Sequence, residues 1–91
     1  MDGNVTIRPD PDVVACELGD GLALLNLQTS TYYSLNKVGA AVWEALQERS
    51  SAQDISLAVS ERFTVTSERC AADVDELLGQ MIDARLAHRD Q

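Results

Sequence analysis

Hydrophobic and polar residues alternate along the first third of the chain in a way that predicts β-strands. The first strand covers residues 13–18, because its apolar side chains recur at every second position and share one face: Val14, Cys16 and Leu18. Gly19-Asp20-Gly21 is a turn signal that predicts a hairpin into a second strand over residues 22–27. The core-facing side of this second strand is expected to carry Ala23, Leu25 and Leu27.

A third strand is predicted over residues 31–35, after a polar turn at residues 28–30. Tyr33 and Leu35 point to one side of this strand, and Tyr32 and Ser34 point to the other. Two tight turns in succession give an antiparallel meander with the second strand in the middle. The third strand is therefore an edge strand, unless the N-terminal residues cover it.

The apolar period becomes that of a helix after Asn36, a residue type that is favoured as an N-cap. The pattern predicts three helices. They cover residues 37–49, with Trp43 in the core; a segment capped by Ser51 that ends near Phe63; and a segment capped by Thr66 or Ser67 that ends near Leu86. The last helix carries an apolar stripe of Cys70, Val74, Leu77, Leu78, Met81 and Ile82. The predicted fold class is α+β, a small three-stranded antiparallel sheet followed by three helices, similar to a winged helix-turn-helix.

Length and charge restrict the classes of function. The 91 residues predict one domain at residues 13–87, between an extended lead-in at 1–12 and a polar tail at 88–91. The net charge of −8 opposes binding to nucleic acids and anionic membranes. No apolar run reaches the roughly 20 residues of a membrane span, and the start does not resemble a secretory signal, so a cytoplasmic protein is expected. Cys16 and Cys70 are expected to be reduced core thiols.

Catalytic motifs are missing from the sequence. The single histidine, His88, lies in the predicted tail, and no nucleophile and base can be assembled around it. Asp73, Asp75 and Glu76 form a cluster that is typical of the solvated side of a helix. We therefore expect no catalytic activity, no cofactor and no metal site.

Residues 24–46, LLNLQTSTYYSLNKVGAAVWEAL, resemble the PqqD-like family, whose members are also called RiPP recognition elements. The resemblance is carried by an apolar strand, by Tyr-Tyr-x-Leu-Asn at residues 32–36 and by Gly-Ala-x-x-Trp at residues 39–43. It extends over about residues 13–86. Family members often end the last helix with Gly-Leu, whereas this chain has Ala84-Arg85-Leu86, so the resemblance does not fix where that helix stops.

The resemblance implies a non-catalytic adaptor that binds the leader region of a ribosomally made precursor peptide and presents it to a maturation enzyme. Stand-alone members with this motif look most like those of lasso-peptide pathways, in which the partner is a leader peptidase. The alternative pathway is quinone-cofactor synthesis, in which such a protein works with a radical enzyme.

Residues 31–35 carry no charge and no proline, two of the devices by which proteins block an exposed strand edge. An extended leader could therefore add to this edge as a further antiparallel strand, with the last helix as the second wall of a groove. We expect the acidic residues of that helix to pair with Lys or Arg in the leader. The predicted leader-binding residues are Thr31, Tyr32, Tyr33, Ser34 and Leu35 on the strand, and Asp73, Val74, Asp75, Glu76, Leu77, Leu78 and Met81 on the helix. The competing interpretation places one tyrosine in plain sheet packing and at least half of the helical stripe in the core.

Two other functions compete with this hypothesis. A winged-helix DNA binder has the same outline, but residues 67–91 carry six acids against three arginines, and this charge opposes phosphate contacts. The other alternative is a structural domain whose open edge pairs with a second copy across a two-fold axis, and the sequence leaves it open.

Overall fold

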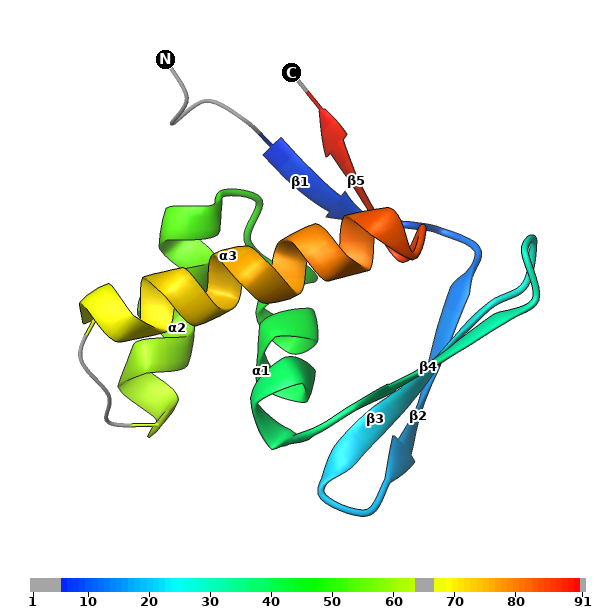
Figure 1. Cartoon of the computed structure of the whole chain (residues 1–91), viewed down its shortest axis with the longest axis horizontal. Helices are drawn as coiled ribbons and strands as arrows, with labels where there is room; N and C mark the ends of the chain where they lie inside the picture. The colour runs from blue at the N-terminus through cyan, green and yellow to red at the C-terminus, as the bar shows by residue number, and fades with distance from the viewer. Residues whose placement is uncertain (1–5, 64–66, 91) are drawn as a thin grey trace.

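The chain folds into two antiparallel sheets and three helices (Figure 1). A computed structural model describes residues 6–63 and 67–90. The elements are β1 (Thr6–Pro9), β2 (Val13–Leu18), β3 (Gly21–Asn26), β4 (Thr31–Leu35), α1 (Lys37–Leu46), α2 (Ala52–Phe63), α3 (Ser67–Asp83) and β5 (Ala87–Asp90). The predicted α+β class, with a three-stranded antiparallel sheet ahead of three helices, is confirmed. Within the described residues, no helix is both long and apolar enough to cross a lipid bilayer.

The larger sheet has the strand order β2-β3-β4, so β4 is an edge strand as predicted. Gly19 has φ 61°, which suits the first central residue of the tight turn between β2 and β3. The register of β3 and β4 pairs Leu22 with Leu35 at one end and Asn26 with Thr31 at the other. Figure 1 shows β4 leading directly into α1.

The second sheet was not predicted. It pairs β1 with β5, in a register that joins Thr6 to Asp90 and Pro9 to Ala87. The N-terminal segment therefore pairs with the C-terminal one and not with β4. The predicted polar tail, residues 88–91, lies for the most part in the paired strand β5. This strand begins at Ala87, which is buried.

The predicted core face of β3 was wrong for two of three residues. Leu24 is completely buried, and Leu22 and Asn26 are buried with it, whereas Leu25 is half-buried and Leu27 is 60 % exposed. The run Leu22-Ala23-Leu24-Leu25 is apolar on both faces, so its period does not indicate which face meets the helices. Ala23 is buried, in agreement with the prediction.

The predicted position of Cys16 was also wrong. Cys16 is exposed, and its neighbours on the same face, Val14 and Leu18, are 46 % and 53 % exposed. The reason is that α1 packs against β3 and β4, and β2 lies beyond them at the far side of the sheet. Cys70 is buried, as expected.

Polar caps begin α1 and α2 at the predicted places. The side-chain oxygen of Asn36 accepts a hydrogen bond from the backbone N–H of Gly39 at 2.9 Å, and that of Ser51 accepts one from Asp54 at 3.1 Å. Trp43 of α1 is buried in the core, as predicted. However, α1 ends at Leu46 and not near residue 49. The predicted break between the second and third helices, at residues 64–66, lies outside the described residues.

The last helix ends at Asp83, three residues before the predicted end at Leu86. Arg85 has φ 63°, and the backbone N–H groups of Leu86 and Arg85 donate to the carbonyls of Met81 and Ile82 at 2.8 and 3.1 Å. These bonds form a Schellman motif, in which a left-handed residue ends the helix. The resemblance suggested Gly-Leu at this helix end, and here Arg85-Leu86 takes that role with Arg85 in the left-handed conformation. Leu86 is completely buried, and from there the chain enters β5.

Substitution of two glycines by alanine is expected to change stability in opposite directions. A Cβ atom at Gly21 would lie 1.8 Å from the carbonyl oxygen of Leu35, so Gly21→Ala must displace β4 and should lower the free energy of unfolding by about 2 kcal/mol or more. A Cβ at Gly79 in α3 meets nothing within 4 Å, so Gly79→Ala should raise it by up to about 1 kcal/mol. Urea unfolding of both variants measures the two changes in the free energy of unfolding. Equal changes would contradict the close approach of the Leu35 carbonyl to Gly21.

Candidate functional site

The outer side of β4 presents unpaired backbone groups. The backbone N–H of Leu27 donates to the carbonyl of Asp12 at 2.9 Å, which fixes the alternation of the ladder between β2 and β3. By this alternation, Leu22, Leu24 and Asn26 of β3 turn their backbone groups toward β4. Thr31, Tyr33 and Leu35 therefore bond to β3, and the backbones of Tyr32 and Ser34 face outward. Among the strands that the structure describes, none pairs with this outer side.

The side chains of β4 divide between two faces as predicted. Leu35 is buried, and Tyr33 is half-buried against the hydrophobic core. Thr31 is half-buried as well. Tyr32 is 62 % exposed and Ser34 is exposed, both on the opposite face of the sheet. The edge therefore has one apolar, partly covered face and one open face.

The structure places most of the predicted apolar residues of α3 in the core. Val74, Leu78 and Met81 are at most 2 % exposed, so a ligand could reach them only if the core around them moved. Leu77 is half-buried and packs against the same core cluster as Tyr33. Leu77 is thus the one apolar residue of the predicted helical set that retains surface.

The three predicted acids of α3 do not share one flank of the helix. Asp73, Asp75 and Glu76 are all exposed, but Asp75 lines a 410 Å³ surface cavity with Ser56 and Leu57 of α2. Leu77 lies about 200° further round the helix than Asp75 and therefore faces away from α2. Asp73 lies within about 40° of Leu77 and remains on that flank, whereas Asp75 belongs to the α2 side.

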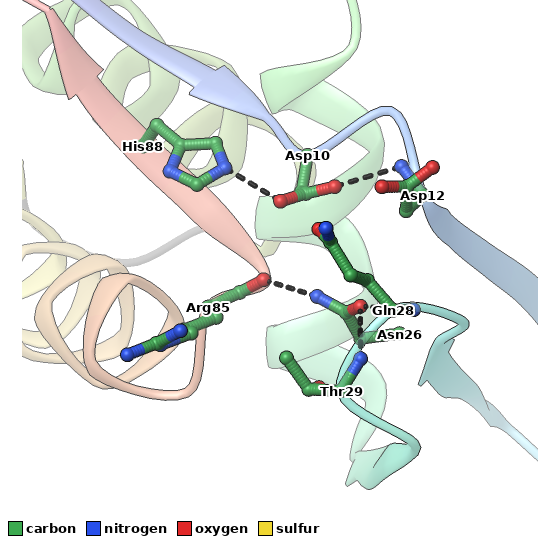
Figure 2. A network of polar contacts seen from close by, with 7 residues as sticks. All are labelled: Asp10, Asp12, Asn26, Gln28, Thr29, Arg85 and His88. Atoms are coloured by element: carbon green, nitrogen blue, oxygen red, sulfur yellow. Dashed lines mark hydrogen bonds and ion pairs between the residues drawn. The ribbon is translucent and has the colours of Figure 1, made fainter.

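A buried amide joins the turn after β3 to the end of α3 (Figure 2). Asn26 is 1 % exposed, and its Nδ2 donates to the backbone carbonyl of Arg85 at 2.7 Å. Its Oδ1 accepts from the backbone N–H groups of Gln28 and Thr29 at 2.9 and 3.1 Å. Asn26 was not among the predicted site residues. The only signal was an asparagine inside the otherwise apolar stretch LALLNL.

A second polar contact joins β5 to the segment after β1. Nε2 of His88 and Oδ2 of Asp10 are 2.5 Å apart, and Oδ1 of Asp10 accepts from the backbone N–H of Asp12 at 2.7 Å (Figure 2). The bond from Asp12 and the contact with His88 hold the pKa of the buried Asp10 carboxyl below its usual range. The backbone of Asp10 also donates to the carbonyl of Leu86 at 2.9 Å, one residue beyond the carbonyl that Asn26 binds.

The described residues offer no group of three or more His, Cys, Asp or Glu side chains that could hold a metal ion. The polar side chains of the two contacts described above are engaged in structural hydrogen bonds. What remains accessible is a strand edge with free backbone groups beside half-buried apolar side chains, an arrangement that suits the binding of an extended chain.

A sequence profile for Coenzyme PQQ synthesis protein D (PqqD) matches residues 21–87. The chain belongs to the PqqD family. Its fold is similar to that of TbiB1 in complex with the TbiA(beta) leader peptide, with a TM-score of 0.80, 27 % sequence identity and coverage of 89 % of this chain and 94 % of that one. It is also similar to a lasso peptide synthetase B1 complexed with the leader peptide, with a TM-score of 0.77, 20 % identity and coverage of 90 % and 96 %. No curated protein matches the chain.

The part of the chain that matches the PqqD profile contains the edge strand β4 and helix α3. Residues 21–87 include β3, β4, all three helices and both residues that the buried amide connects, Asn26 and Arg85. Strands β1 and β2 lie outside this range. The match to the PqqD profile therefore covers the edge strand β4 and the residues that connect it to α3.

The lowered pKa of Asp10 predicts a specific loss of stability in acid. Its ionised form is favoured in the folded state, so its contribution is present above the ordinary pKa of 3.8 and is lost as the pH falls through the lower folded value. Asp10→Asn should therefore be less stable than the native chain at neutral pH, and the difference should shrink in acid. Chemical unfolding from neutral pH to about pH 2 measures this.

The matched control is Asp12→Asn, since the side chain of Asp12 is exposed and the bond to Asp10 uses its backbone. This variant should follow the native chain across the same range. A gap between Asp10→Asn and the native chain that stays constant down to the lowest pH would contradict the role of the Asp10 charge.

Proposed function

We propose that this PqqD-family chain binds the leader region of a ribosomally synthesised precursor peptide as an added antiparallel strand along β4. It presents the leader to a maturation enzyme and catalyses no step itself. The observation that carries the proposal is the row of outward backbone groups at Tyr32 and Ser34, on an edge without charge or proline. Further support comes from TbiB1, 27 % identical, which has been solved in complex with a leader peptide.

In this mode of binding, backbone hydrogen bonds and side-chain contacts contribute differently to affinity and selectivity. Hydrogen bonds to the backbones of Tyr32 and Ser34 are made by any extended chain, so they supply affinity that tolerates different sequences. Tyr33 and Leu77, both half-buried, offer apolar contacts to those leader side chains that point toward the helices. A disordered leader loses conformational entropy on binding, and such apolar anchors offset that loss.

Acidic residues around the site favour a leader that carries Lys or Arg. The chain has a net charge of −8, and Asp73 and Glu76 are exposed on α3. Surface charges of this kind attract a basic segment weakly and are screened by salt. The same charge disfavours the winged-helix DNA-binding alternative.

We place the chain in a lasso-peptide pathway, with a leader peptidase as the enzyme served. A cytoplasmic location fits this role, and residues 13–87 would form the binding unit. Both solved relatives carry leader peptides, and the second is a lasso peptide synthetase B1. Quinone-cofactor synthesis is the alternative pathway, because the matching family profile takes its name from that process.

Leader binding is tested by titrating a fluorescently labelled leader peptide, taken from the precursor encoded beside this chain, with the purified protein. Fluorescence anisotropy should rise to saturation with a Kd at least about tenfold lower than that of a scrambled leader of the same composition. Equal affinities for the two peptides would remove the proposed function.

Strand addition is tested by proline substitution at an outward-facing position. Ser34→Pro removes a backbone N–H that β3 does not use, so the fold should tolerate it while leader affinity falls by about tenfold or more. The matched control is Ala15→Pro, which removes an outward N–H from the opposite edge strand, β2. A loss of leader binding in both variants, or in neither, would contradict addition at β4.

A further inference from the structure

The hydrogen bonds of Asn26 require an amide side chain. Its Oδ1 accepts two backbone N–H groups and its Nδ2 donates to a backbone carbonyl, so one residue must both accept and donate. Aspartate has the same shape but, when ionised, cannot donate, and it would place a carboxylate against the carbonyl of Arg85. At 1 % exposure, water cannot replace these partners.

These bonds act both on the start of β4 and on the end of α3. On the strand side, Asn26 pairs with Thr31, the first residue of β4, and its backbone carbonyl accepts from Ser30 at 2.8 Å. On the helix side, Arg85 is the left-handed residue that ends α3. Since 59 residues separate Asn26 from Arg85, this contact ties the beginning of β4 to the end of α3 across the fold.

The opposite end of β4 is held by another asparagine. Asn36 follows Leu35 directly and caps α1 through Gly39. The edge strand is thus fixed to α1 at its end and to α3 at its beginning. Without the amide of Asn26, the start of β4 would lose its hydrogen-bonded connection to the end of α3.

We propose that Asn26 is a positioning residue that sets the spacing between β4 and α3 and thereby the affinity of the site for an extended peptide. The inference rests on the proposed function for its binding consequence, but its structural part can be measured without a peptide. If β4 and α3 are already held at the right distance, a peptide can bind without first ordering these two elements. Such preorganisation lowers the free-energy cost of binding.

The first experiment measures the spacing. Spin labels at Ser34→Cys on β4 and Gln80→Cys on α3, both exposed positions, are introduced with Cys16→Ser, because Cys16 is exposed. Double electron–electron resonance should give a narrow distance distribution with Asn26 and a broader one with Asn26→Asp. Equal widths overturn the positioning role, whether or not a leader binds.

The second experiment measures binding with the labelled leader. At about pH 7.5, Asn26→Asp should bind about tenfold more weakly at a temperature where the variant is fully folded. The introduced carboxylate can still accept from the backbone N–H groups of Gln28 and Thr29, so the substitution removes only the bond donated to Arg85 and sets a negative charge against that carbonyl.

Gln28→Ala is the matched control for both experiments. The side chain of Gln28 is exposed, and its backbone N–H, which Asn26 uses, is unchanged. A folded Asn26→Asp variant with native leader affinity overturns the role of the amide in binding. If the native chain binds leader and scrambled peptide equally, the proposed function fails, and the distance distributions still decide the role of Asn26.

Discussion

The side-chain amide of Asn26 connects parts of the chain that lie far apart in sequence. It closes the turn into β4 through two accepted hydrogen bonds and reaches the end of α3 through one donated bond. Asn26 is buried, and an unpaired polar group there would cost about 1–3 kcal/mol. The amide therefore ties the turn that leads into β4 to the end of α3.

Beta-strand edges are usually protected against association, and β4 is not. Its outward backbone groups have no partner among the described strands, and its residues include neither proline nor charge. Asn26 bonds to the turn that precedes β4, and Asn36 caps the helix that follows it. Both contacts are made without a bound peptide. Rigidity of the receptor compensates in part for the disorder of a free leader, because only one partner then loses conformational freedom on binding.

Local signals in the sequence predicted most of the elements, and non-local contacts explain the errors. The turn at Gly19 and the caps at Asn36 and Ser51 depend on neighbouring residues, and all three occur where expected. The face of β3 depends instead on which side the helices cover, which an apolar run on both faces does not reveal. Pairing of β1 with β5 joins opposite ends of the chain, and the end of α3 depends on an arginine in a conformation that glycine usually takes. The edge strand of the candidate site was thus foreseeable, whereas Asn26 was not. The burial of Val74, Leu78 and Met81 agrees with the competing interpretation, which placed at least half of the helical stripe in the core.

The pairing of β1 with β5 also determines where additional polypeptide could be attached. Figure 1 shows β1 and β5 side by side. Thr6 and Asp90 are register partners at one end of this two-stranded sheet, and Pro9 and Ala87 are partners at the other, two residues after the Arg85 carbonyl that Asn26 binds. A domain or tag joined before Thr6 or after Asp90 would leave the molecule from nearly the same point. Fusion at either terminus would thus put the added mass at one place, beside the two-stranded sheet.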